Sequence, residues 1–312
     1  MATEGLRQRL RGIYPAVPTP LTTAGGLDEG GLRKLIVHLL EGGVHGLWML
    51  GSGGSFAVLT SQQRRQVTRI AVEEAAGRVP VLAGASDCAT EATITNARTV
   101  ADLGADGAFV VAPYYFFHTQ DELVGHFEEV ALEGRVPVMI YNNPINTKNG
   151  LTLESLDTLS RDHRILGVKD SSCDFALFQQ LVHRFKDRPE FRIFQGSEST
   201  IAPSFLFGAQ GAVLGVANVA PRLCVDLYEA AQRRQLDRLI ALEAQFLDLL
   251  AIEQVDRGST DRSFMGGIQA ALELMGICGR TLAKPLVTFS EAEVAVVAQL
   301  LNTGLLEARS SK

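Results

Sequence analysis

One lysine of the sequence stands where a reactive amine would be useful. Of the six lysines, only Lys169 directly follows a fully apolar run, residues 165–168. Such a run is typical of a buried strand, and burial disfavours the charged form of an ammonium group. A neutral amine can attack a carbonyl carbon and form a Schiff base, an electron sink for chemistry at the adjacent C–C bond. The alternative is a structural lysine that pairs with Asp170 or another nearby carboxylate.

Two tyrosines occupy comparable positions at the ends of other apolar runs. Tyr141 closes the run over residues 136–141, and Tyr115 comes shortly after the run over residues 107–111. A phenol can relay protons beside a lysine of this kind. Tyrosine is also common at barrel rims, where its ring packs and its hydroxyl meets water. Taken singly, each tyrosine therefore favours a structural role.

A glycine-rich turn, residues 51–55, follows another apolar run. The backbone N–H groups of such a turn can bind an anion, and Ser52 adds a hydroxyl donor. A small carboxylate is the expected guest, and a phosphate is the rival. The alternative is a tight turn that needs glycine only for positive φ.

The elements that would position these residues alternate along the chain. Short apolar runs, continuous as in strands buried on both faces, are separated by segments of helical period. The runs are residues 13–17, 46–50, 79–83, 107–111, 136–141, 165–168, 191–194 and 211–214. The pattern predicts an α/β fold, a (β/α)8 TIM barrel, with a doubly wound open sheet as the alternative.

The alternation stops after Gln232, and three further helical segments are expected within residues 236–301. We therefore predict a catalytic barrel domain over residues 1–232 and a C-terminal helical region over residues 233–312. Chemistry in such barrels takes place at the C-terminal ends of the strands. This placement would bring the lysine, the tyrosines and the glycine turn to one end of the barrel.

Composition argues against several classes of partner. The chain has 29 Lys+Arg against 35 Asp+Glu, a net charge of −6 and no basic run, so we expect no nucleic-acid binding. The apolar runs are too short to span a membrane, and residues 1–11 are polar and mixed in charge, so we expect neither a membrane segment nor a signal peptide. Four scattered cysteines without a CxxC pair fit a reducing cytoplasm.

Motif spacing argues against the common cofactors. The six histidines show no HxH or HxxxH spacing, so we expect no metal. No GxGxxG opens a helix after a strand, which disfavours a nicotinamide or flavin. No GxSxG turn is present, and Cys173 has no evident histidine partner, so neither a serine nor a cysteine nucleophile is indicated.

Several segments that follow the apolar runs carry a resemblance when they are taken together. They are Pro18-Thr19-Pro20, Gly51-Ser52-Gly53-Gly54, Pro113-Tyr114-Tyr115, Tyr141-Asn142-Asn143-Pro144, Gly167-Val168-Lys169-Asp170-Ser171-Ser172, Gly196-Ser197 and Ala217-Asn218-Val219-Ala220-Pro221. In order and spacing the chain resembles the dihydrodipicolinate synthase / N-acetylneuraminate lyase family of class I aldolases. The resemblance covers about residues 10–303.

The resemblance implies a pyruvate-type 2-oxo acid that forms an imine on Lys169, with no metal or organic cofactor. Tyr141 would be the acid/base at the reacting carbon. Tyr115 would complete a proton relay from the neighbouring subunit, and Ser52 would supply a relay hydroxyl. The family also implies a homotetramer built as a dimer of dimers.

The same resemblance implies a place for the oxo acid. Its carboxylate would bind Ser52 and the N–H group of Gly53, and Val213 would lie beside it. The family turn has a second hydroxyl residue and ends in Glu, whereas this chain has Gly53 and Ser55. These departures would reduce activity, or redirect it to a different 2-oxo acid or to an unusual biosynthetic condensation.

The acceptor side departs from two branches of the family. Asn146 stands where dihydrodipicolinate synthases have an arginine for the carboxylate of the aldehyde, and Asn cannot replace that bidentate contact. Glu198-Ser199 and Gly215 differ from the neuraminate lyase pattern. The run that holds Lys169 is more similar to that of the 2-keto-3-deoxy-sugar-acid aldolases.

Three residues, Ser171, Glu198 and Asn146, could bind a polyhydroxylated chain, and the alternative for each is loop stabilisation. The expected activity is a Schiff-base lyase that cleaves or condenses pyruvate with an aldehyde, with a 2-keto-3-deoxy sugar acid as the substrate type. The alternatives are dihydrodipicolinate synthase-like chemistry, a dehydratase or deaminase that uses the same imine, and a barrel that binds a 2-oxo acid without turnover.

Overall fold

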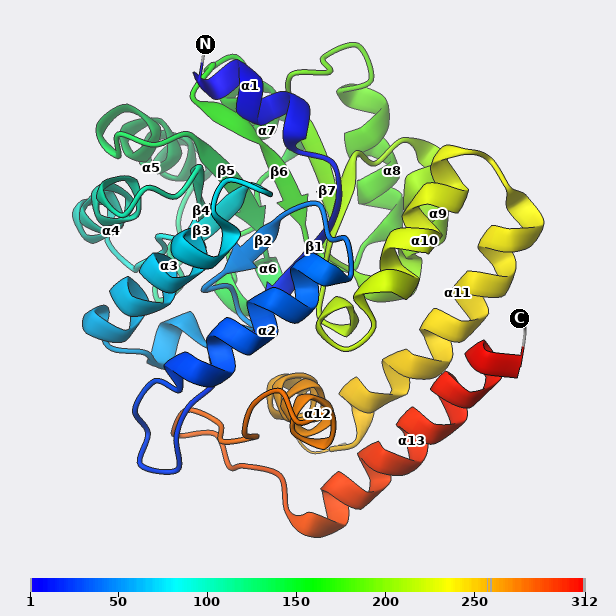
Figure 1. Ribbon diagram of the computed structural model, residues 1–312. Helices are drawn as coiled ribbons and strands as arrows, with labels where there is room; N and C mark the ends of the chain where they lie inside the picture. Colours follow the sequence, from blue (N-terminus) through cyan, green and yellow to red (C-terminus); the bar gives the residue numbers. More distant parts are fainter. Residues whose placement is uncertain (1, 257, 259, 311–312) are drawn as a thin grey trace. The chain divides into compact units, whose positions relative to one another are not determined.

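The computed structural model describes residues 2–256, 258 and 260–310 (Figure 1). Over these residues the strands form a closed barrel in sequential order, β1 to β8. They are β1 (Gly12–Val17), β2 (Leu47–Met49), β3 (Val81–Gly84), β4 (Gly107–Val111), β5 (Val138–Asn142), β6 (Ile165–Asp170), β7 (Arg192–Gln195) and β8 (Gly211–Leu214). The predicted (β/α)8 barrel is confirmed.

Helices connect the strands and continue after the last one. The α-helices are α1 (Ala2–Arg9), α2 (Glu29–Glu41), α3 (Ser61–Ala75), α4 (Thr90–Asp102), α5 (Gln120–Glu133), α6 (Pro144–Thr147), α7 (Leu153–Leu159), α8 (Phe175–Arg184), α9 (Ile201–Phe207), α10 (Pro221–Gln232), α11 (Leu236–Leu250), α12 (Thr260–Leu274) and α13 (Glu291–Ser310). Short 3-10 helices are η1 (Phe56–Val58), η2 (Glu198–Thr200), η3 (Val216–Asn218) and η4 (Ala251–Gln254). In the part of the chain described, no helix is long and apolar enough to cross a membrane.

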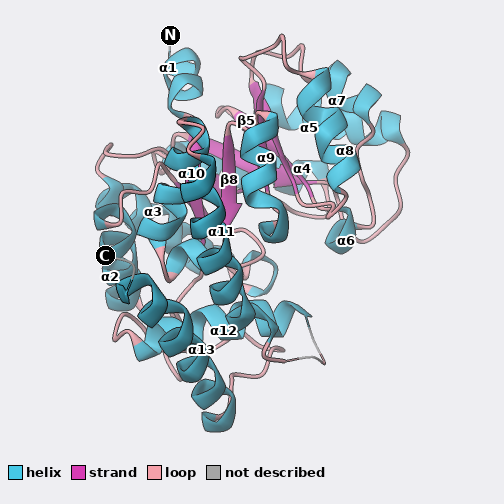
Figure 2. Cartoon of the chain, turned by 90° about the vertical axis from the view of Figure 1, so that its right-hand side faces the viewer, coloured by secondary structure: helices cyan, strands magenta, loops and turns pink. Residues whose placement is uncertain are grey.

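The chain forms two compact units. The first comprises residues 1–14, 45–48 and 76–213, and the second comprises residues 15–44, 49–75 and 214–312. In the first unit α5 packs against α7 (Figure 2), and in the second α11 packs against α13 (Figure 1). The predicted helices after Gln232 are present as α11, α12 and α13, and the division of the chain at that residue stays a prediction.

The strands are buried on both faces, which explains their uninterrupted apolar sequences. Every residue of β4, β5 and β6 is buried. The pairs from β3 to β8 are parallel, so their C-terminal ends share one edge. In this register Lys169 of β6 lies opposite Tyr141 of β5. The fold therefore brings the lysine and one of the two tyrosines together.

A β-bulge in β6 precedes the lysine. Val138 pairs with Ile165 but Met139 pairs with Gly167, so Leu166 is the extra residue. Gly167 has a φ of +153°, and a Cβ atom there would overlap the backbone of Arg192. Only glycine fits this close approach, and the bulge sets which side chains of β6 face the interior.

Helix α1 was not among the predicted elements. Its sequence is short and polar, and its position depends on contacts with distant strands. The guanidinium of Arg7 donates to the carbonyl oxygens of His163 and Ile165, and the Nε of Arg192 donates to the carbonyl oxygen of Arg7. Such contacts have no signature in local sequence.

Candidate active site

Lys169 lies inside the barrel at the end of β6, and only 5% of its surface is exposed. Its Nζ is 3.9 Å from the ring centroid of Tyr141 and 5.3 Å from that of Trp48. Cations are attracted to aromatic ring faces at such distances. The amine is therefore enclosed by rings contributed by β2 and β5.

The rings around the lysine pack on one another. Trp48 stacks on Phe109 with centroids 3.8 Å apart and an interplanar angle of 12°. Both rings meet Tyr141 edge to face, with centroids 5.8 Å and 6.1 Å away. These geometries are typical of favourable aromatic pairs. Trp48 and Phe109 were not among the predicted site residues, although the one tryptophan of the sequence, placed within a strand-like run, was a usable signal.

The hydroxyl of Tyr141 has a defined neighbour. Nδ2 of Asn143, a buried residue, donates to Tyr141 Oη over 3.2 Å. Because the amide occupies a lone pair of the phenol oxygen, the phenol proton is directed elsewhere. Asn143 thus orients the group that could transfer protons near Lys169.

Asp170, the residue after the lysine, is bound by other groups. Its carboxylate accepts 2.7 Å hydrogen bonds from Asn142 Nδ2 and Ser172 Oγ. Burial raises the pKa of Asp170, and these two hydrogen bonds act in the opposite direction. Across the described residues no ion pair joins Asp170 to Lys169, so the structural pairing considered from sequence is absent.

The model of the Dihydrodipicolinate synthetase family matches residues 9–303. The chain belongs to this family. An uncharacterised DapA-like lyase of Halobacterium salinarum is 36% identical over 95% of each chain. The putative 2-dehydro-3-deoxy-D-gluconate aldolase YagE of Escherichia coli is 32% identical over 87% of this chain and 88% of its own.

Solved structures agree with this assignment. The dihydrodipicolinate synthase of Bacteroides thetaiotaomicron has a TM-score of 0.90 and 34% identity, covering 94% of this chain and 98% of its own. The structure of YagE in complex with pyruvate has a TM-score of 0.89 and 31% identity. The match covers 95% of this chain and 99% of the YagE chain. Members of the dihydrodipicolinate synthetase family are lyases that act on pyruvate, and this chain is a lyase of that kind.

The glycine turn of this family member belongs to the second unit. Its backbone closes on itself, because the N–H group of Ser55 donates to the carbonyl oxygen of Ser52 over 2.9 Å. Thr19 Oγ1 donates to the carbonyl oxygen of Gly54 over 2.8 Å. A Cβ atom on Gly53 would lie 3.1 Å from the ring of Phe264. The role of Ser52 and Gly53 in binding a carboxylate stays a prediction.

Phe264 also explains a second departure from the family pattern. A Cβ atom on Gly215 would lie 2.5 Å from the Phe264 ring and 2.5 Å from Glu253 Oε1. A serine at position 215 would therefore displace one of these side chains. Phe264 was not among the predicted site residues, because nothing in the order of residues links α12 to two glycines at distant positions in the sequence.

The other predicted site residues of the first unit are placed as follows. A Cβ atom on Gly196 would overlap Ser171 Oγ and lie 2.6 Å from Lys169 Cε, so Ser171 and Lys169 both border this glycine. Val213 is buried in β8, Glu198 is half-buried at the start of η2, and Asn146 is exposed on α6.

Tyr115 is not enclosed with Lys169 in this chain. Its side chain is 71% exposed and contacts Phe116 edge to face, with centroids 5.0 Å apart. Its expected role in the site of a neighbouring subunit stays a prediction. Among the residues that the structure describes, no group of His, Cys, Asp and Glu side chains could hold a metal ion.

Proposed function

We propose that this protein is a Schiff-base aldolase that joins or cleaves pyruvate and a hydroxylated aldehyde, with a 2-keto-3-deoxy sugar acid as the condensed substrate. One observation carries the proposal: Lys169 Nζ lies 3.9 Å from the Tyr141 ring within a buried aromatic enclosure. An amine in this position meets a phenol and no carboxylate partner among the described residues.

The chemistry follows from these two groups. The amine of Lys169 attacks the keto carbon of pyruvate, and loss of water from the carbinolamine leaves an imine. Removal of a methyl proton gives an enamine, whose carbon attacks the aldehyde; the reverse sequence cleaves the aldol. Tyr141 donates and accepts the protons, oriented by Asn143. Water then hydrolyses the imine and returns the amine, so these steps require no metal or organic cofactor.

The hydroxylated aldehyde is supported by the groups beside the lysine. Ser171 borders Gly196 together with Lys169, and we assign it a hydrogen bond to the sugar chain. Asn146 and Glu198 are further candidates for such bonds. The similarity to YagE, a putative 2-dehydro-3-deoxy-D-gluconate aldolase, supports the same substrate class.

A second candidate is the dihydrodipicolinate synthase reaction. It is favoured by the 34% identity and the TM-score of 0.90 to the Bacteroides thetaiotaomicron enzyme. It is disfavoured by Asn146, which cannot make the bidentate contact of an arginine with a second carboxylate. An aldehyde that carries its own carboxylate is therefore the weaker substrate.

The imine is tested by borohydride reduction in the presence of pyruvate. Intact-mass and peptide analysis should find a reduced pyruvyl adduct on Lys169 in the wild type and no adduct in Lys169→Ala. Lys148→Ala, which removes an exposed lysine of the same unit, is the matched control and should keep the adduct. A wild-type protein that stays unmodified would refute the proposal.

The substrate is tested by turnover. Pyruvate release from 2-keto-3-deoxygluconate should exceed condensation of pyruvate with aspartate semialdehyde, and the reverse ranking favours the second candidate. Loss of water or ammonia without C–C cleavage would indicate a dehydratase or deaminase. Imine formation without turnover of any of these substrates would indicate a 2-oxo-acid-binding barrel.

We further propose that the working form is a cytoplasmic homotetramer, a dimer of dimers in which Tyr115 serves the neighbouring subunit. The exposed side chain of Tyr115 supports this role, because a relay group of its own site would be enclosed with Lys169. Light scattering should give the mass of four chains. A monomer with full activity would contradict the assignment of Tyr115.

A further inference from the structure

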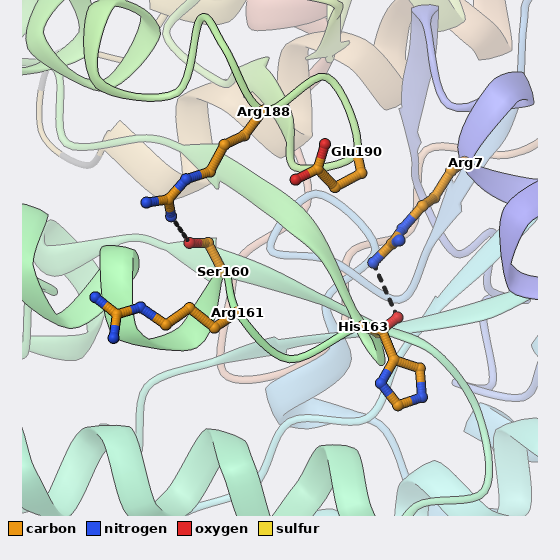
Figure 3. A pocket seen from close by; sticks show the side chains of 6 residues that line it. All are labelled: Arg7, Ser160, Arg161, His163, Arg188 and Glu190. Atoms are coloured by element: carbon orange, nitrogen blue, oxygen red, sulfur yellow. Dashed lines mark hydrogen bonds between the residues drawn. The ribbon is translucent and has the colours of Figure 1, made fainter.

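A cavity of about 230 Å³ lies in the first unit, apart from the reactive lysine. Arg7 of α1 lines it together with residues of the segments that precede β6 and β7, whereas Lys169 lies at the other end of β6. Three arginines, a histidine, a serine and one glutamate form its wall: Arg7, Arg161, Arg188, His163, Ser160 and Glu190 (Figure 3).

Two of the arginines share one carboxylate outside the cavity wall. Arg161 and Arg188 approach the oxygens of Asp157 at 3.0 Å and 3.1 Å, and Arg184 approaches the same group at 3.2 Å. Arg188 also donates to Ser160 Oγ over 2.6 Å (Figure 3). These three guanidinium groups carry three positive charges, and the carboxylates of Asp157 and Glu190 carry two negative ones. An excess of positive charge therefore remains at the cavity even before Arg7 is counted.

Arg7 adds a buried guanidinium that has no carboxylate partner in the part of the chain that the structure describes. Only 9% of the residue is exposed, and its Nη2 donates to the carbonyl oxygens of His163 and Ile165. Its Nε is buried and lacks a hydrogen-bond partner among the described residues. A buried guanidinium charge is costly unless an anion compensates for it, and Arg7 belongs to the wall of the cavity.

We propose that this cavity binds the phosphate group of a small hydroxylated metabolite. The planar guanidinium fork matches phosphate oxygens, and a dianion would offset the excess charge of Arg7, Arg161 and Arg188. Glu190 is the one acid of the wall and suits a hydroxyl donor, which favours a phosphate ester of a polyol over free phosphate. The proposal is independent of the lysine chemistry.

Calorimetric titration of the full chain tests this site with two probes, inorganic phosphate and glycerol 3-phosphate, at constant ionic strength. The Lys169→Ala variant is used throughout, so that imine chemistry contributes no heat. We expect one site per chain, with glycerol 3-phosphate bound more tightly than inorganic phosphate. Equal affinity for both probes would overturn the role of Glu190, and tighter binding of inorganic phosphate would do the same.

Arg161→Gln is the informative variant. The side chain of Arg161 is 72% exposed, so that its replacement should leave the fold intact. It should weaken the affinity for glycerol 3-phosphate at least about fivefold, since one charge-assisted contact is lost. Arg222→Gln is the matched control: Arg222 is 70% exposed and pairs with Asp226 at the same i,i+4 spacing. Glu190→Gln should tighten the binding of inorganic phosphate.

Two results would overturn the proposal. One is the absence of saturable binding up to about 10 mM of either probe. The other is an equal loss of affinity in Arg161→Gln and Arg222→Gln, which would mean that the anions respond only to net charge.

Discussion

The amine of Lys169 lies against the faces of two aromatic rings rather than against a carboxylate. Among the residues that the structure describes, no ion pair of Lys169 has to be broken before the amine reaches a carbonyl carbon. The neighbouring Asp170 carboxylate is bound instead by Asn142 and Ser172. At the scale of single residues, the site therefore separates a reactive lysine from the acid that follows it in sequence.

The substitution Tyr141→Phe tests whether the hydroxyl group of Tyr141 transfers protons. We expect kcat to fall about 10²–10³-fold, because general acid–base catalysis contributes about that much. The free energy of unfolding should fall by only about 1 kcal/mol, since one hydrogen bond to Asn143 is lost. Steady-state kinetics and thermal denaturation measure the two effects. Activity within twofold of the wild type would exclude Tyr141 as the proton-transfer group.

The close approach of the Phe264 ring to Gly53 can be tested by substitution. Gly53→Thr restores the hydroxyl residue of the family but would press on Phe264, so we expect destabilisation by about 1–3 kcal/mol. Combining it with Phe264→Ala should cost less than the sum of the two single changes, because the ring that clashes is gone. Denaturant unfolding of the four proteins measures the coupling. If the two effects were additive, contact with the Phe264 ring would not be the reason for a glycine at position 53.

At the scale of elements, the bulge in β6 positions the lysine. An extra residue at Leu166 shifts the register, and Gly167 passes the backbone of Arg192 where no side chain fits. Lys169 then lies opposite Tyr141. The contact between lysine and tyrosine thus depends on a glycine two positions away.

Gly167→Ala should destabilise the protein by about 2–4 kcal/mol, because its Cβ atom overlaps backbone that cannot move alone. The borohydride adduct on Lys169 should form more slowly in the folded variant. Gly125→Ala is the control, because its Cβ would meet nothing within 4 Å in α5 and should stabilise the helix by up to about 1 kcal/mol. Equal stability of the two variants would argue against strain at the bulge.

At the scale of the whole molecule, a charge cluster of the second unit contributes to stability. In the second unit Arg262 bridges Asp256 and Glu293, with nitrogen–oxygen distances of 2.6 Å and 2.8 Å. The hydrogen bond from Arg262 is the main cause that lowers the pKa of Glu293 to about 2. Backbone and side-chain donors of Ser290 act in the same direction.

This carboxylate makes the protein sensitive to acid. Because the folded pKa is depressed, the stabilisation is complete above the ordinary value of 4.5 and is lost as the pH falls towards about 2. Glu293→Gln should lose about 1 kcal/mol at neutral pH and little at pH 2. The loss at neutral pH is modest because the ion pair is partly solvated. Denaturant unfolding between neutral pH and pH 2 measures this difference in the free energy of unfolding. Arg262→Gln should show the same pH dependence, and an unchanged acid profile in both would contradict the prediction.

The barrel was predictable from sequence because strands buried on both faces must be apolar without interruption. The same logic singled out Lys169, since a lysine that ends such a run is exceptional, and Tyr141 for its place at the end of another. The family resemblance followed from the residues after the strands. The helices after Gln232 were equally visible, because helical period survives in local sequence.

Tertiary structure alone decided which groups meet. The ring of Trp48 on Lys169, the amide of Asn143 on Tyr141 and the ring of Phe264 against two glycines join segments far apart or side chains whose directions depend on register. Arg7 of helix α1 contacts residues 156 and 158 positions away, and the cavity is lined by this arginine and by the segments before β6 and β7. Local sequence records periodicity and residue type, whereas such contacts depend on the register and bulges of the closed barrel.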